Sequence, residues 1–291
     1  MKSIIKQSNK NSAFTIVELL TVMSIIVILI GLLVPALNMV RRYAWEVKQK
    51  AQFHSIDAAL ELFNTEFSGY PDSIALGPDG RPYCGAMKLC EAMMGQDLMG
   101  FHPDSIFRSD GTDGVRELYP NAATVTPEEY RDNLSVRKGP YLPLESANAY
   151  TLEDIYSNTG DFDSRHFVLC DVYRTVTNRT TGKKIGMPVL YYKANTANSL
   201  HNIDDPTNTN NIYNYLDNQA LIALGIPSAP PGNTGHRLYD PVRFYKNTKN
   251  DKVATASRPY RADSYILISA GFDGEYGTPD DVCNYDWKYL P

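Results

Sequence analysis

The chain has 291 residues, enough for one large domain or two of ordinary size. Its 28 Lys and Arg against 33 Asp and Glu give a formal net charge of −5, and this argues against an electrostatic nucleic-acid binder, which needs a basic surplus or patch. Between Leu19 and Val40, 22 consecutive residues carry no charge and 17 of them are hydrophobic. This block excludes an ordinary soluble protein.

The apolar block follows a short basic leader. Residues 1–13 contain Lys2, Lys6 and Lys10 and no acidic residue, which favours a cytoplasmic position for this end. A helix of 22 residues reaches about 33 Å, and the hydrocarbon core of a bilayer is about 30 Å thick. We therefore expect a single membrane-spanning helix, with the acidic remainder of the chain outside the cytoplasm.

Two simpler readings of this segment compete. A cleaved secretory signal has a shorter apolar stretch, although residues 34–36, Val-Pro-Ala, imitate its cleavage site. A plain membrane anchor fits the length but gives no reason for Glu18, because a carboxylate in an apolar segment is costly and normally has a partner. The sequence therefore predicts a pairing partner for Glu18.

Residues 12–20 read Ser-Ala-Phe-Thr-Ile-Val-Glu-Leu-Leu, which resembles the N-terminal signature of the type IV pilin and type II secretion pseudopilin superfamily. In that family a basic leader is removed just before a Phe, the new N-terminus is methylated, and a Glu stands at the fifth mature position. Phe14 and Glu18 have this spacing, and Pro35 falls where the family often has a helix-bending proline.

The resemblance implies roles for these residues. A prepilin peptidase would cut between Ala13 and Phe14, and Glu18 of one subunit would neutralise the new amine of a neighbour inside a helical bundle. Glu18 and Pro35 are then assembly residues and not catalysts. The family usually has Gly before the cleaved bond, so Ala13 is a departure, and we expect cleavage to survive it because Ala is the smallest side-chain substitute.

Beyond the span, apolar residues recur at spacings of three and four through residues 41–68, which predicts an amphipathic continuation of the helix. It should stop at Ser68-Gly69-Tyr70-Pro71, where Gly69 supplies a C-cap and Pro71 cannot continue. The predicted organisation is a leader at 1–13, an assembly helix at 14–40, its continuation at 41–68 and a globular head at 69–291.

The sequence of the head, residues 69–291, predicts both helices and strands. Residues 72–163 are rich in turn formers and look like a large irregular insertion, with short helices from about Gly85 to Met99 and from Pro127, capped by Thr126. Strand patterns at 167–175, 189–192 and 265–269 predict a small antiparallel sheet against the helix, the first two as a hairpin. The expected fold class is α+β.

An acidic, glycine-rich loop at 269–281 follows the last predicted strand. Four carboxylates fall within nine residues, and close carboxylates repel each other unless a cation neutralises them. The loop resembles the calcium loop of the major type II pseudopilin head, and this likeness implies Ca²⁺ ligands at Asp273, Asp280 and Asp281 with the carbonyl of Ala270. The alternative is a solvated acidic turn.

The sequence offers few other candidate sites for a disulfide, for catalysis or for nucleotide binding. Cys84 and Cys90 are compatible with a disulfide in an oxidising compartment, but free buried thiols are equally allowed. The sequence has no nucleophile elbow, phosphate loop or dinucleotide fingerprint, so we do not expect an enzyme.

The leading hypothesis is a structural subunit of a type II secretion pseudopilus or a related type IV pilus-like filament. By the resemblance, its partners would be further copies of itself, other pseudopilins, the prepilin peptidase and the assembly platform of the inner membrane, with no nucleic acid. The alternative is a membrane-anchored or filament-tip module that binds a protein or a glycan. A third hypothesis, a membrane-anchored hydrolase, has no catalytic motif in the sequence to support it.

Overall fold

The computed structural model describes residues 15–227, 235–253 and 257–286. The chain divides into two compact units between Ala44 and Trp45. Helices and strands follow one another in this order: α1 (Ile16–Phe67), α2 (Gly85–Met94), α3 (Pro127–Val136), α4 (Leu144–Ala147), β1 (Ala149–Thr151), α5 (Leu152–Ile155), β2 (Phe167–Leu169), β3 (Val176–Thr177), β4 (Lys184–Ile185), β5 (Leu190–Lys193), the 3-10 helix η1 (Tyr215–Asn218), α6 (Gln219–Ile222), the 3-10 helix η2 (Arg237–Tyr239), α7 (Pro241–Thr248), β6 (Tyr265–Ser269) and β7 (Val282–Cys283).

The second part of α1 belongs to the larger unit and is amphipathic. Phe53, Ile56, Leu60 and Phe63 are almost completely buried, and their spacings of three and four place them along one side of the helix. The predicted end of the helix is confirmed to within a residue. Ser68, with φ of 55°, takes the left-handed conformation that we expected of Gly69.

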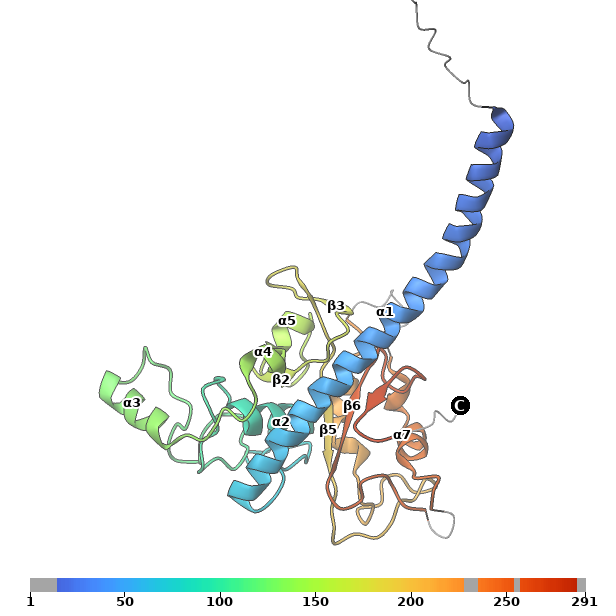
Figure 1. The fold of residues 1–291 in the computed structure, drawn as a ribbon. Coiled ribbons are helices and arrows are strands. Elements are labelled where there is room, and N and C mark those ends of the chain that lie inside the picture. Colours follow the sequence, from blue (N-terminus) through green and yellow to red (C-terminus); the bar gives the residue numbers. More distant parts are fainter. Residues whose placement is uncertain (1–14, 228–234, 254–256, 287–291) are drawn as a thin grey trace, which may run out of the picture. The chain divides into compact units, whose positions relative to one another are not determined.

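A small antiparallel sheet of three strands lies beside α1 (Figure 1). The central strand β6 pairs with β5 through Leu190 opposite Ile268, and with β7 through Ser269 opposite Val282. All five residues of β6 are buried. A long N-terminal helix with small antiparallel sheets makes this an α+β fold, as predicted, and the arrangement is compatible with a pilin-like architecture.

The predicted hairpin of the first two strands is formed in part. β2 pairs with β1, and the residues after it meet those before β5 in one antiparallel bridge, between Cys170 and Pro188. Two backbone hydrogen bonds flank this bridge, from the Asp171 amide to the Met187 carbonyl at 2.8 Å and from the Val189 amide to the Leu169 carbonyl at 2.7 Å. The connection between the two segments closes in the short hairpin β3–β4.

The segment interpreted as an insertion contains a core element. Every residue of α2 is buried, and α2 packs against β2 and β5. The helix ends at Gly95 and not near Met99, because Gly95 has φ of 81° and a Cβ there would lie 2.1 Å from the carbonyl oxygen of Gly100. α3 begins as predicted, with a capping box between Thr126 and Glu129.

Candidate functional site

The first candidate site is the beginning of α1. Glu18 accepts hydrogen bonds from the backbone amide of Thr15 at 2.9 Å and from its hydroxyl at 2.8 Å, while the amide of Glu18 donates to the Thr15 hydroxyl. These reciprocal bonds form a capping box around the first turn. The carboxylate is exposed in the isolated chain. Ala13 and Phe14, the predicted cleavage site, lie outside the described residues.

The part of α1 in the smaller unit exposes a long apolar run from Leu19 to Leu37, with charged residues only near its two ends. All of its residues from Ile16 to Ala44 are exposed, including more than a dozen Leu, Ile, Val and Met side chains. Pro35 lies inside this continuous helix. Within the described part of the chain, α1 is the one helix long and apolar enough to cross a membrane. Side chains of this kind require lipid or other helices around them.

The second candidate site is the predicted calcium loop, which runs from the end of β6 to β7. Its two ends approach each other so closely that a Cβ on Gly271, which has φ of 66°, would lie 2.2 Å from the carbonyl oxygen of Asp280. Asp280 closes the loop by accepting the backbone amides of Phe272 at 2.7 Å and Asp273 at 3.0 Å. Asp281 is buried and accepts the amide of Gly277 at 2.7 Å.

The carboxylates of this loop lie close enough to repel one another. Asp273 stands at the surface, and partial desolvation of its carboxylate raises its pKa to about 6, with a further contribution from the nearby Asp280 carboxylate. Burial also raises the pKa of Asp281 well above its usual value, again with a contribution from the neighbouring carboxylates. Glu275 turns to Arg237 instead, with 3.1 Å between Oε1 and Nε. The loop thus keeps a cluster of carboxylates that favours protonation or a cation.

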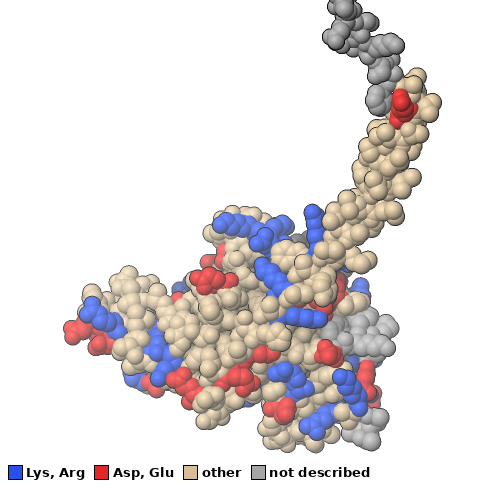
Figure 2. Space-filling model, in the orientation of Figure 1, with Lys and Arg blue, Asp and Glu red and all other residues tan. Residues whose placement is uncertain are grey.

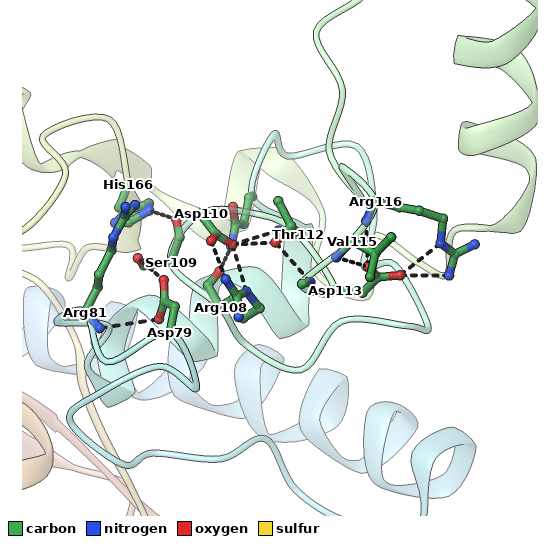
Figure 3. A network of polar contacts seen from close by, with 12 residues as sticks. Asp79, Arg81, Arg108, Ser109, Asp110, Thr112, Asp113, Val115, Arg116 and His166 are labelled. Carbon is green, nitrogen blue, oxygen red and sulfur yellow. Dashed lines mark hydrogen bonds and ion pairs between the residues drawn. The ribbon is translucent and has the colours of Figure 1, made fainter.

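A second acidic, glycine-rich segment in the head shows the opposite electrostatics. In residues 108–116, Asp110 pairs with Arg108 at 2.6 Å and Asp113 pairs with Arg116 at 2.8 Å (Figure 3). The Arg108 side chain lowers the pKa of Asp110, and the backbone amides of Arg116 and Val115 lower that of Asp113. This segment needs no cation, because arginines already balance its charge.

The predicted ligands lie close together but do not form a finished metal site. Across the described ranges, no group of three or more His, Cys, Asp or Glu side chains is arranged to hold a metal ion. The Asp280 and Asp281 oxygens face backbone amides, and Ala270 is buried at the start of the loop. For these residues to bind Ca²⁺, the two carboxylates would have to turn from the amides to the ion.

The cysteines do not form a disulfide in the structure. All four are buried free thiols. Cys84 precedes α2 and packs in one half of the core, whereas Cys90 packs in the other half with α1. A spacing of six residues along a helix turns the two side chains apart, so the Cys84–Cys90 bridge allowed by the sequence is not made. Burial raises the pKa of Cys84 to about 11, which makes it a poor nucleophile.

The sequence did not indicate Asp171, which anchors the strand that leads into the acidic loop. This buried carboxylate accepts a hydrogen bond from Ser269 Oγ at 2.9 Å, and burial raises its pKa to about 7. Asp171 belongs to no sequence motif, so nothing in the sequence distinguishes it from the other aspartates.

Comparison with known proteins gave no matching family model, no matching curated protein and no matching solved structure. The likeness to pilins therefore rests on the residues of the N-terminal segment and on the architecture.

Proposed function

We propose that this chain is a structural subunit of a pseudopilus of type II secretion or of a related type IV pilus-like filament. The observation that carries the proposal is the division of α1 into two parts. Its first part, Ile16–Ala44, is exposed and mostly apolar, with Glu18 in its first turn, while its second part, Trp45–Phe67, packs into the core of the head. A helix of this kind is suited to lipid before assembly and to a bundle of like helices afterwards.

The proposed work of the chain is mechanical. Copies of residues 14–40 would pack their apolar surfaces together in the filament core, and the heads would form the outside. The partners are other copies of the chain, other pseudopilins, a prepilin peptidase and the assembly platform in the inner membrane. Energy would come from a separate ATPase.

Removal of the leader tests this proposal chemically. We expect the chain extracted from membranes of cells that carry a prepilin peptidase to begin at Phe14, with one methyl group on its amine. Mass spectrometry of the intact protein and of its N-terminal peptide measures this. Cells without the peptidase serve as the control and should yield only the longer chain. Recovery of chains that all begin at Met1 in the presence of the peptidase would contradict processing.

We also propose that the loop 269–281 binds Ca²⁺ through Asp273, Asp280 and Asp281. Its support is the contrast between the raised pKa of Asp273 and Asp281 and the arginine-balanced acidic segment at 108–116. The ion would replace the protons that this cluster otherwise favours and would fix the end of β6 to β7.

Chelation should lower the melting temperature of the head. At a free Ca²⁺ concentration a hundredfold above Kd, binding stabilises the folded state by about 2.7 kcal/mol, which corresponds to roughly 5–10 °C for a unit of this size. Thermal unfolding of the full chain in mild detergent, with and without chelator, measures the shift. Asp280→Ala should abolish the sensitivity, and Asp110→Ala, the matched change in the arginine-balanced segment, should leave it intact. Identical melting of the parent chain with and without chelator would refute the proposal.

The alternative function, a membrane-anchored or filament-tip binding module, has one feature in its favour. Residues 95–138 are ordered by buried polar contacts, among them four hydrogen bonds that Glu91 accepts from Tyr83, Gln96, Ser105 and Tyr119. A rigid surface segment of this kind suits recognition of a protein or a glycan. Loss of Glu18 would leave such a module working and would stop a filament subunit.

A further inference from the structure

The β3–β4 hairpin carries a concentration of positive charge that the net charge of the chain conceals. Residues 172–203 contain five Lys and Arg and no Asp or Glu, in a chain with a formal net charge of −5. Four of these cations fall within eleven residues of the hairpin region, and all four are exposed. They are Arg174, Arg179, Lys183 and Lys184.

This hairpin region lies where α1 enters the head. The Arg174 guanidinium lies 5.6 Å from the centre of the Trp45 ring, and the Lys48 ammonium lies 5.2 Å from the same ring. Figure 1 shows β3 beside α1, and Figure 2 shows Lys and Arg side chains gathered over this part of the head. We call Lys48, Arg174, Arg179, Lys183 and Lys184 the basic collar.

The basic collar is not neutralised by the protein itself. Within the described part of the chain, none of its five cations forms an ion pair, whereas Arg108, Arg116 and Arg137 each pair with an aspartate. Of the nearby carboxylates, Glu46 pairs with Lys50, and Asp154 accepts a hydrogen bond from Thr151 but forms no ion pair within the described ranges. The exposed cations are thus available to an outside anion.

The entry to the head follows the apolar run closely along the chain. Trp45 follows the apolar run by only five residues of continuous helix, which is about 8 Å from the end of the span at Val40. This length equals about one Debye length at physiological ionic strength, so charges at the entry to the head still attract anionic headgroups, although salt weakens the attraction. Trp45 also has the amphipathic ring that is typical of membrane interfaces.

We propose that the basic collar docks the head on anionic phospholipid headgroups of the membrane in which α1 is anchored. The inference rests on the proposed membrane anchor and adds a second contact, made by the head itself. Docking holds the stored subunit in one orientation at the bilayer surface, and the subunit leaves that surface when it is drawn into a filament. Each Lys or Arg near an anionic surface contributes a factor of about five to such binding.

The test uses the full chain in lipid nanodiscs and energy transfer from the hairpin to the bilayer. A dye on Thr180→Cys, in the exposed turn of the hairpin, is the donor, and a headgroup-labelled lipid is the acceptor; the four native cysteines are buried. We expect higher transfer in discs that contain phosphatidylglycerol than in pure phosphatidylcholine discs. High salt should remove the difference, because the Debye length falls to about 3 Å at 1 M.

A pair of matched variants identifies the surface. Lys183→Gln with Lys184→Gln should lower the ratio of docked to undocked heads about thirtyfold in anionic discs. Lys246→Gln with Lys252→Gln removes the same charge from α7 and the loop after it, away from the hairpin (Figure 1), and should change nothing. Equal transfer in both lipids, or equal losses in both variants, would overturn the proposal. A chain that fails to co-elute with the discs would instead contradict the anchor.

Discussion

Replacing Glu18 by Gln should reduce incorporation of the chain into filaments by about a hundredfold or more and should leave its insertion into the membrane unchanged. The reason is the loss of one partner of an ion pair in an apolar bundle, because the amine of the neighbouring subunit is then buried without a counter-charge, at a cost of about 3–5 kcal/mol. Incorporation is measured as the share of chain recovered in sheared filaments relative to the membrane fraction.

The capping box at the start of α1 provides the control. A Gln at position 18 can still accept the hydrogen bonds from Thr15, so Glu18→Gln removes the charge and keeps the cap. Thr15→Ala does the opposite, at a cost of about 1 kcal/mol of helix stability. If Thr15→Ala abolished assembly and Glu18→Gln did not, Glu18 would serve the helix end and not the contact between subunits.

Replacing Arg137 by Met should destabilise the head by about 3 kcal/mol. The Arg137 side chain is only 1% exposed and lies 2.6 Å from Asp97. Its guanidinium also donates to Asn133 and to the backbone carbonyl of Leu118, and it lies 4.8 Å from the centre of the Tyr119 ring. Met fills similar space, but it leaves these acceptors without their donor. Denaturant unfolding of the full chain in mild detergent measures the loss.

An exposed pair of the same type is the reference for this change. Arg165 pairs with Asp163 at 2.7 Å, but its side chain is 80% exposed, so Arg165→Met should cost less than about 1 kcal/mol. Equal destabilisation by the two variants would show that the Arg137 contacts do not hold residues 95–138 in place.

The features that could be predicted from the sequence are those with a local cause. The length of α1 follows from its apolar run and its amphipathic continuation, and the start of α3 follows from Thr126, Pro127 and Glu129. β6 was recognisable because Tyr265–Ser269 is a continuous buried run with strong strand propensity. The resemblance grouped Asp273, Asp280 and Asp281 in one loop, and in the structure Asp280 accepts the backbone amide of Asp273.

The features that were missed depend on contacts between distant residues. β2 pairs with β1 through Leu169 opposite Ala149, twenty residues earlier, and the sequence did not indicate β1. α2 was predicted as a helix, and its mostly apolar residues favour burial, but its packing on β2 and β5 joins it to strands that lie far along the chain. Likewise, the partners of Glu91 and Arg137 are spread over more than twenty residues each, so the order of residues 95–138 comes from tertiary polar contacts that composition cannot reveal.

Imaging shows whether the chain assembles into a filament. Filaments sheared from cells that carry the chain and its assembly machinery are labelled with an antibody against residues 69–291 and viewed by electron microscopy. We expect label on the filaments, along their length for a major subunit or at the tip for a minor one. Unlabelled filaments, with all of the chain in the membrane fraction of the same cells, would contradict it.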